Sequence, residues 1–394
     1  MISKLSFDCP PKTTHTQTSE STPTKLNTFF FISVFVGLLL VGGCALFAPS
    51  PKITHHLDDL VVMDIPAIQN YERSFLGRIR ICRTFYRSYD DEFDAILILS
   101  NIPWGSERLK TLRIHGNMRL VRNSVQGTGI RRFDSGKVYG SPSKLKGILD
   151  LPTHHALLLG YSLHELAHLW VVNRRVIPTT SKNHWGFSSV NGVLGGFDRT
   201  TLVELGNDRF VAASFMPNRG YPQANKKPYS ELELYLAGFI PIEEVPDIWV
   251  AEDGRFVRDP DGVIEKDENG NFVFQAKRIS IWRNEDIVKK LGPRVPNHKD
   301  SQKSIRLAVI AINNNSNPLE DTDISYVRKA IELFTREESI GHIDSIAIES
   351  STRKWSFNPG LYNFWEATGG RGTIDAHIAS ERKETQEATP FRDN

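Results

Sequence analysis

A short stretch of the sequence has the residue types and the spacing of a metal-dependent hydrolytic centre. His164, Glu165 and His168 form the pattern HExxH. Because residues four apart lie on the same face of an α-helix, both imidazoles can bind one Zn²⁺. Glu165 would lie beside the metal, where its carboxylate can take a proton from a metal-bound water. The pattern predicts one zinc ion per chain, with Glu165 as general base.

A catalytic zinc needs a third protein ligand and one open position. The extended motif HExxHxxGxxH would place a histidine where the chain has Arg174, so this motif is excluded. His184 is the preferred third ligand, because its loop carries Trp185 and a glycine that can hold an imidazole in place. The carboxylate alternatives are Glu204, Glu231 and Glu233. Glu233 is the strongest of them, since a second helix is predicted there.

The elements around the motif follow from hydrophobic patterning. The apolar run 94–100 predicts a buried strand. Residues 145–152 alternate in polarity and end at a proline, which indicates an edge strand. One helix is predicted from His154 to Val172, with Thr153 as N-cap and a costly glycine at position 160. The metal-binding helix thus directly follows an edge strand.

Further elements are predicted downstream. Ser230 and Gly238 are the expected caps of a second helix, and a strand at 305–312 and a helix at 325–336 complete the core. Turn signals between short β-like runs indicate a surface hairpin excursion at 251–275. Several other residues near these elements have open roles: Tyr235 as proton donor or core residue, Gly192, Gly195 and Gly196 in a tight turn or surface loop, and His154 and His155 as capping or solvated residues.

The N-terminus has the parts of an export signal. Polar, lysine-containing residues precede the uncharged apolar run 29–41, and small residues lead to Cys44. The sequence before Cys44 resembles a bacterial lipobox, so residues 1–43 are predicted to be a lipoprotein signal peptide and Cys44 the lipidation site. The alternative is an uncleaved transmembrane signal anchor. Residues 44–59 are predicted to be a tether, 60–380 the folded domain, and 381–394 a disordered tail.

Composition narrows the class of protein. The chain has 394 residues, of which 40% are hydrophobic and 24% charged, as is ordinary for a globular protein. A net charge of +2 without a basic block gives no argument for binding nucleic acid. After removal of the signal peptide, Cys82 would be the only cysteine besides Cys44, so an intramolecular disulfide scaffold is excluded. Cys82 itself is predicted to be a small buried hydrophobic residue.

Several stretches together resemble a family. The HExxH pattern, His184-Trp185-Gly186, residues 195–197, residues 229–238, residues 241–245 and residues 364–371 are similar, in this order, to a group of bacterial zincin-like envelope proteins. Only HExxH is specific by itself. The resemblance implies an α+β fold with a zincin-like metallopeptidase domain. It implies no particular substrate, and it leaves both His184 and Glu233 as third ligand.

The predicted function is a zinc-dependent metallopeptidase of the bacterial cell envelope, anchored to the membrane through lipid on Cys44, with the outer membrane as the favoured location. Zn²⁺ would activate a water, Glu165 would accept its proton, and the hydroxide would attack a carbonyl of a peptide or protein substrate. Two alternatives remain open. One is a non-catalytic zinc-binding module, and the other is a metal-dependent hydrolase of a non-peptide bond or a cell-wall amide.

Overall fold

The computed structural model describes the part of the chain that would carry this centre. Described are residues 50–65, 74–103, 106–111, 116–171, 176–178, 184–213, 224–339, 348–350, 353–355 and 360–379. All of them belong to one of two compact units, Pro49–Asn394. The predicted signal peptide 1–43, Cys44 and the predicted tail 381–394 lie outside the described residues. Within the described ranges, no helix has the length and apolar character needed to cross a membrane.

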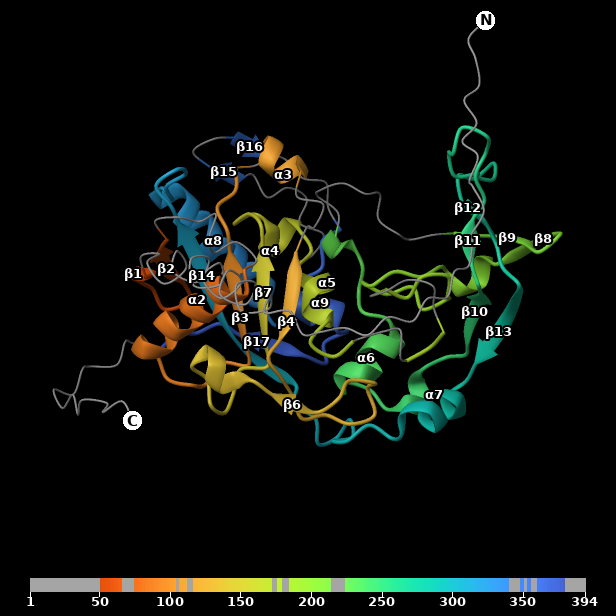
Figure 1. Ribbon diagram of the computed structural model, residues 1–394, viewed down its shortest axis with the longest axis horizontal. Helices are drawn as coiled ribbons and strands as arrows, with labels where there is room; N and C mark the ends of the chain where they lie inside the picture. Colours follow the sequence, from red (N-terminus) through yellow and green to blue (C-terminus); the bar gives the residue numbers. More distant parts are fainter. Residues whose placement is uncertain are drawn as a thin grey trace, which may run out of the picture. The chain divides into compact units, whose positions relative to one another are not determined.

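A mixed sheet forms the centre of the fold (Figure 1). Its order is β1-β2-β14-β3-β7-β4, and β17 pairs with the start of β14. The strands are β1 (Lys52–His56), β2 (Val61–Asp64), β3 (Ala95–Leu99), β4 (Asn117–Leu120), β7 (Gly147–Leu151), β14 (Ser304–Asn313) and β17 (Thr373–Asp375). β2, β14, β3 and β7 run parallel, whereas β1 and β4 are antiparallel edge strands. This mixed architecture is compatible with the predicted α+β class.

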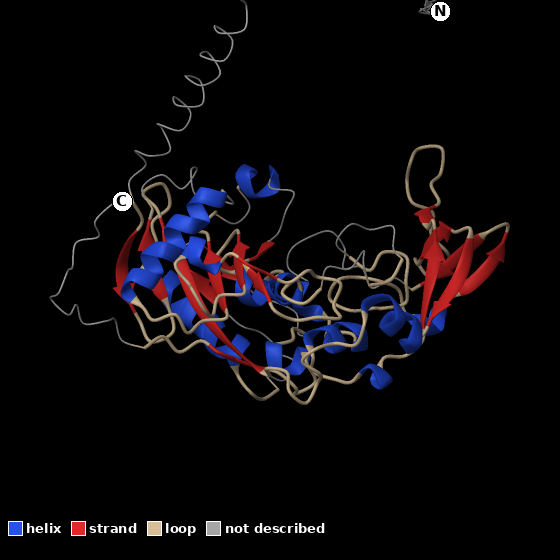
Figure 2. Cartoon of the chain, turned by 60° about the horizontal axis from the view of Figure 1, so that its bottom comes forward, coloured by secondary structure: helices blue, strands red, loops and turns tan. Residues whose placement is uncertain are grey.

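Helices cover the two faces of the sheet, as the helix and strand colours of Figure 2 show. The helices are α2 (Phe75–Ser88), α3 (Glu107–Thr111), α4 (Ala156–Leu159), α5 (Ser162–Ala167), α6 (Glu231–Ala237), α7 (Asn284–Leu291), α8 (Asp321–Thr335) and α9 (Phe364–Ala367). Successive side chains of a strand point to opposite faces. Leu97 therefore packs in the cluster of α4, α5 and α8, whereas Ile96 and Ile98 pack against α2. The buried strand predicted at 94–100 is confirmed, and both of its faces are covered.

Smaller sheets lie outside this core. A four-stranded sheet has the order β11-β12-β9-β8, and further strands form pairs. Their bounds are β5 (Arg122–Asn123), β6 (Phe133–Asp134), β8 (Val203–Gly206), β9 (Arg209–Ala212), β10 (Ile248–Glu252), β11 (Arg255–Phe256), β12 (Phe272–Gln275), β13 (Arg278–Trp282), β15 (Ile348–Ser350) and β16 (Arg353–Trp355). Within the predicted excursion 251–275, β11 and β12 are strands, whereas the β-like run at 263–264 forms only an isolated bridge, between Ile264 and Arg258. The predicted surface position is wrong for β12, because Phe274 of this strand is fully buried in a cluster with Phe210 and Trp249.

Three predictions about element boundaries are wrong. The strand before the metal motif is not at the edge, because β7 lies between β3 and β4. Its polar residue Asp150 is buried against Arg78 of α2, and Pro152 follows the last paired residue, so neither interrupts the sheet. The predicted single helix 154–172 is two short helices, α4 and α5. The fold also begins earlier than predicted, since β1 lies inside the expected tether 44–59.

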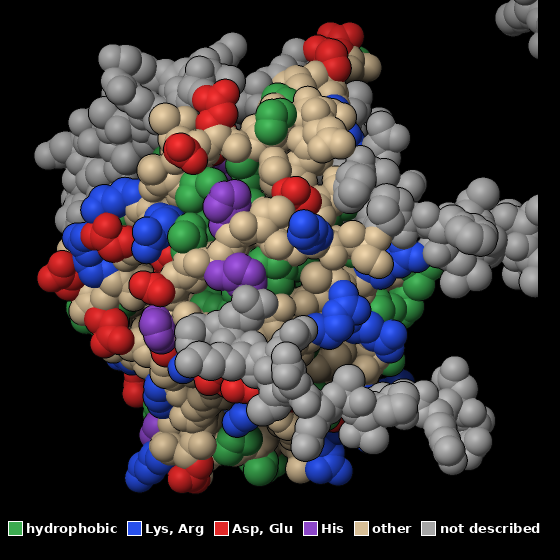
Figure 3. Space-filling view, turned by 90° about the vertical axis from the view of Figure 1, so that its left-hand side faces the viewer, with side chains coloured by type: hydrophobic (Ala, Val, Ile, Leu, Met, Phe, Trp, Pro, Cys, Tyr) green, Lys and Arg blue, Asp and Glu red, His purple; other side chains and the backbone are tan. Residues whose placement is uncertain are grey.

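Charged side chains of both signs share the face of the molecule shown in Figure 3. On the face shown in Figure 3, Lys and Arg side chains are interspersed with Asp and Glu. This distribution agrees with the net charge of +2 for the whole sequence. It gives this face no uniformly basic surface of the kind that follows a nucleic-acid backbone.

Candidate metal centre

The short helix α5 carries the metal motif, and a buried asparagine fixes where that helix begins. α4 ends at Gly160, where a Cβ would lie 2.6 Å from the carbonyl oxygen of Ala156. Across this break, Asn225 donates from Nδ2 to the carbonyls of Leu157 and Leu158 at 3.1 and 3.0 Å. Its Oδ1 accepts from the backbone N–H of Leu163 at 3.1 Å. The Asn225 amide replaces the helical bonds that the glycine break removes.

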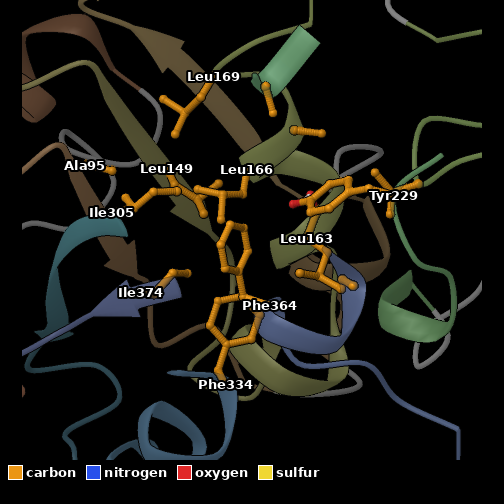
Figure 4. Close-up of a cluster of buried hydrophobic side chains, with 14 of the residues drawn as sticks. Ala95, Leu149, Leu163, Leu166, Leu169, Tyr229, Ile305, Phe334, Phe364 and Ile374 are labelled. Atoms are coloured by element: carbon orange, nitrogen blue, oxygen red, sulfur yellow. Dashed lines mark hydrogen bonds between the residues drawn. The ribbon is translucent and has the colours of Figure 1, made fainter. Parts of the chain in front are cut away.

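The inner face of α5 packs against the sheet (Figure 4). Leu163 and Leu166 point into the same buried cluster as Leu149 of β7 and Phe364 of α9. Tyr229 adds a hydrogen bond from its hydroxyl to the carbonyl of Leu163 at 2.9 Å. Because the apolar side of the helix is fixed in this way, its other side is held at a defined distance from the loops that follow.

Three histidines converge on that other side. His164, His168 and His184 each offer a ring nitrogen, and these three nitrogens lie within 4.8 Å of one another. The ring centroids are 5.4 Å apart for His164 and His168, and 4.9 Å apart for His164 and His184. All three side chains are half-buried, so the cluster is enclosed by protein but keeps access to solvent. Such a group could hold one metal ion, and three protein ligands are the number that a catalytic zinc site uses.

The tautomers of the first two histidines suit a metal. Nδ1 of His164 lies 2.9 Å from the carbonyl oxygen of Val193, and Nδ1 of His168 lies 3.2 Å from that of Val171. A carbonyl oxygen only accepts, so in the neutral form of each ring Nδ1 carries the proton and Nε2 keeps the lone pair with which an imidazole can bind a metal. The Nε2 atoms of His164 and His184 lie 3.0 Å apart. Two nitrogens bound to one tetrahedral zinc lie about 3.3 Å apart, so the residues fit the ion.

Burial favours the neutral, metal-binding form of the His168 and His184 imidazoles. It lowers the pKa of His168 to about 4, an effect strengthened by the nearby His184 and opposed by the Val171 carbonyl. Burial also lowers the pKa of His184. Zinc competes with protons for imidazole nitrogen, so a lowered pKa leaves the nitrogens available at neutral pH.

Glu165 is positioned between α5 and the edge strand β4. Its side chain is buried at 8% exposure. A Cβ on Gly116, the residue before β4, would lie 2.5 Å from Cγ of Glu165. The glycine is therefore required for the close approach of the carboxylate to the strand. Glu165 is the neighbour of His164 in the chain, and His164, His168 and His184 are the only group of potential metal ligands found among the described residues.

Glu233, the alternative third ligand, does not join this cluster. Its carboxylate accepts hydrogen bonds from Trp185, Val193, Leu194 and Ser230. Burial raises its pKa, and these four N–H donors oppose the rise. All its bonds run to N–H groups, so the prediction of Glu233 as a zinc ligand receives no support from the geometry. The helix predicted at this position is confirmed, with Ser230 and Gly238 as its caps.

The other candidate residues do not belong to the histidine cluster. Glu204 and Glu231 are exposed, and Glu231 lies 3.9 Å from Arg199. Tyr235 is buried at 5% exposure, which agrees with a core residue. Cys82 is fully buried as predicted, and burial raises the pKa of its thiol.

The structure resolves the open roles of two glycines, Gly192 and Gly195, and of two histidines, His154 and His155. Gly192 and Gly195 form a tight turn, each donating its N–H to the carbonyl of the other. His154 and His155 were expected to be capping or solvated. His155 is the N-cap residue of α4, in place of the predicted Thr153, although its side chain makes no capping hydrogen bond. Neither His154 nor His155 is solvated, because both are buried. His154 contacts Asn101 at 2.9 Å and Asp323 at 3.4 Å.

Sequence reasoning missed the residues that act through tertiary contacts. Asn225 belongs to no periodic segment, and Gly116 is one glycine among 28. The Val193 carbonyl that orients His164 is a backbone group, which carries no sequence signal. Trp185 is the one signal that the sequence offered for the position of His184, because an aromatic residue beside it indicates a loop held in place by packing.

Comparisons with known proteins add no family to this description. No protein-family model, curated protein or solved structure matches the chain. The function proposed below therefore rests on the geometry of the site itself.

Proposed function

We propose that the protein is a zinc-dependent metallopeptidase with a zincin-like domain. The observation that carries this proposal is the convergence of His164, His168 and His184, with Glu165 next to His164 in the sequence. A site that only stabilised the fold would have four protein ligands and no access to solvent. Three imidazole ligands would leave one position open on the metal, and Glu165 would supply the base.

The proposed roles follow from this arrangement. The three histidines would hold Zn²⁺, which supplies Lewis acidity and an acidified water when bound. Glu165 would accept the proton of that water and deliver it to the leaving amine. The Val193 and Val171 carbonyls would keep the two helix imidazoles in the binding tautomer.

An edge strand favours a peptide as the substrate. β4 is the last strand of the sheet, and its outer edge pairs with no strand in the part of the chain that the structure describes. Exposed strand edges bind extended peptides through backbone hydrogen bonds. Because Gly116 brings the start of β4 against Glu165, a peptide added there would run past the proposed base.

Metal analysis tests the proposal. We expect about one zinc per chain in the wild type and none retained in the double variant His164→Ala, His168→Ala. The matched control is His55→Ala, His377→Ala, because both of these histidines are exposed and lie outside the cluster. Zinc content that is the same in all three proteins would contradict the metalloprotein assignment.

We also propose that the N-terminal segment anchors the protein to the bacterial cell envelope through lipid on Cys44. The support is the sequence pattern alone, an apolar run followed by small residues and a cysteine. Cys44→Ser is expected to abolish incorporation of a palmitate analogue, because the lipid-bearing thiol is removed. Equal labelling of wild type and variant would contradict the lipobox. Membrane retention without labelling in both would favour the uncleaved signal anchor.

A further inference from the structure

The carboxylate of Glu233 organises the back of the histidine cluster without touching the metal position. Oε1 accepts from Nε1 of Trp185 at 2.8 Å and from the backbone N–H of Leu194 at 2.9 Å. Oε2 accepts from the backbone N–H groups of Val193 at 3.1 Å and Ser230 at 2.9 Å. The side chain is 2% exposed, so all four bonds form in a water-poor interior.

One peptide unit connects this carboxylate to a proposed zinc ligand. The carbonyl of Val193 accepts from Nδ1 of His164, and the N–H of the same peptide, on Leu194, donates to Glu233. A carboxylate that polarises the N–H end of a peptide strengthens its carbonyl as an acceptor. A stronger acceptor at Nδ1 raises the basicity of Nε2, the atom that faces the cluster.

The same carboxylate fixes the third histidine through its neighbour. Trp185 is fully buried, and its indole N–H is bonded to Glu233. Its backbone N–H donates to the carbonyl of Leu194 at 3.1 Å, within the tight turn that Glu233 holds. The loop that presents His184 is therefore tied to the same side chain as the carbonyl that orients His164.

We propose that Glu233 is the positioning residue of the metal centre, acting on His164 through the Val193–Leu194 peptide and on His184 through Trp185. This inference rests on the proposed zinc site. In this proposal Glu233 does not bind the metal. Its carboxylate acts on the His164 imidazole through the backbone peptide that lies between them.

Glutamine at position 233 tests this role because it keeps the shape and loses two acceptor positions. Its NH₂ group would face two N–H donors that the carboxylate now satisfies. Glu233→Gln is expected to bind zinc about 10- to 100-fold more weakly than the wild type. The measurement is a zinc titration with a competing chelator on folded protein. Glu231→Gln on the same helix is exposed and should bind like the wild type.

Two further variants separate positioning from stabilisation of α6. Ser230→Ala removes the hydroxyl that caps the helix and leaves the Glu233 carboxylate in place, so it should lower the melting temperature without changing zinc affinity. Gly192→Ala would place a methyl group onto the Glu233 carboxylate. It should weaken zinc binding like Glu233→Gln, although no charged group is removed.

The outcomes distinguish this inference from the proposed function. If the wild type binds no zinc, the proposed function is wrong. If the wild type binds zinc and both Glu233→Gln and Gly192→Ala bind it equally well, the positioning role alone is wrong. If zinc affinity falls in Ser230→Ala to the same extent as in Glu233→Gln, helix stability accounts for the effect and the inference is again wrong.

Discussion

Glu165→Gln is expected to keep about one zinc per chain and to hydrolyse peptides two to four orders of magnitude more slowly, roughly the contribution of a positioned general base. The amide has nearly the shape of the carboxylate but cannot accept a proton from a metal-bound water. Glu165 is 92% buried and packed against Gly116, so the isosteric change leaves its surroundings intact. The measurement is kcat/KM on casein or peptide libraries, together with zinc content and melting temperature.

The control for this experiment is Glu204→Gln, an exposed change on β8 that should leave hydrolysis unaltered. Loss of zinc from Glu165→Gln would mean that this carboxylate is a ligand, contrary to the role proposed here. A wild type that binds zinc but cleaves no peptide, casein or cell-wall fragment would favour the non-catalytic binding module. Cleavage of a cell-wall amide alone would favour the hydrolase of non-peptide bonds.

Local patterns in the sequence predicted the strand β3, the helix α6 and the pairing of two histidines. The apolar run of β3 predicts a buried strand because a parallel strand is covered on both faces. Ser230 and Gly238 predict the ends of α6 because capping depends on nearby residues. His164 and His168 are brought together by helical geometry alone, which is why their pairing could be predicted.

The helix break at Gly160 and the choice of third ligand depend on long-range contacts, which local sequence patterns do not predict. The break at Gly160 is stabilised by Asn225, which is distant in the sequence and whose amide donates to the buried carbonyls of Leu157 and Leu158. The choice between His184 and Glu233 depended on which side chain the loop turns toward the cluster. Both residues belong to the site region, but the imidazole faces the ligands and the carboxylate faces backbone N–H groups. The spacing of His184 and Glu233 from the HExxH motif does not decide which of them is the third ligand.

The proposal that His184 is the third ligand leads to the second prediction with a large expected effect. His184→Ala is expected to weaken zinc binding by roughly two orders of magnitude or more, because the 10–16 kcal/mol of a four-ligand zinc site corresponds to about 3 kcal/mol per ligand. Activity should fall with occupancy, since His164 and His168 alone hold the ion loosely. The measurement is a zinc titration of wild type and variant under identical chelator conditions.

Imidazole rescue distinguishes loss of a ligand from loss of support. Removing the His184 side chain vacates a half-buried space beside Nε2 of His164, which free imidazole can enter and where it can donate a nitrogen to the metal. Added imidazole should therefore restore zinc affinity to His184→Ala. It should not restore affinity to Glu233→Gln, because all three imidazoles are still present there and only their positioning is impaired. If His184→Ala retains full zinc affinity without imidazole, His184 is not the third ligand, and the search moves to a carboxylate that reaches the cluster when metal binds.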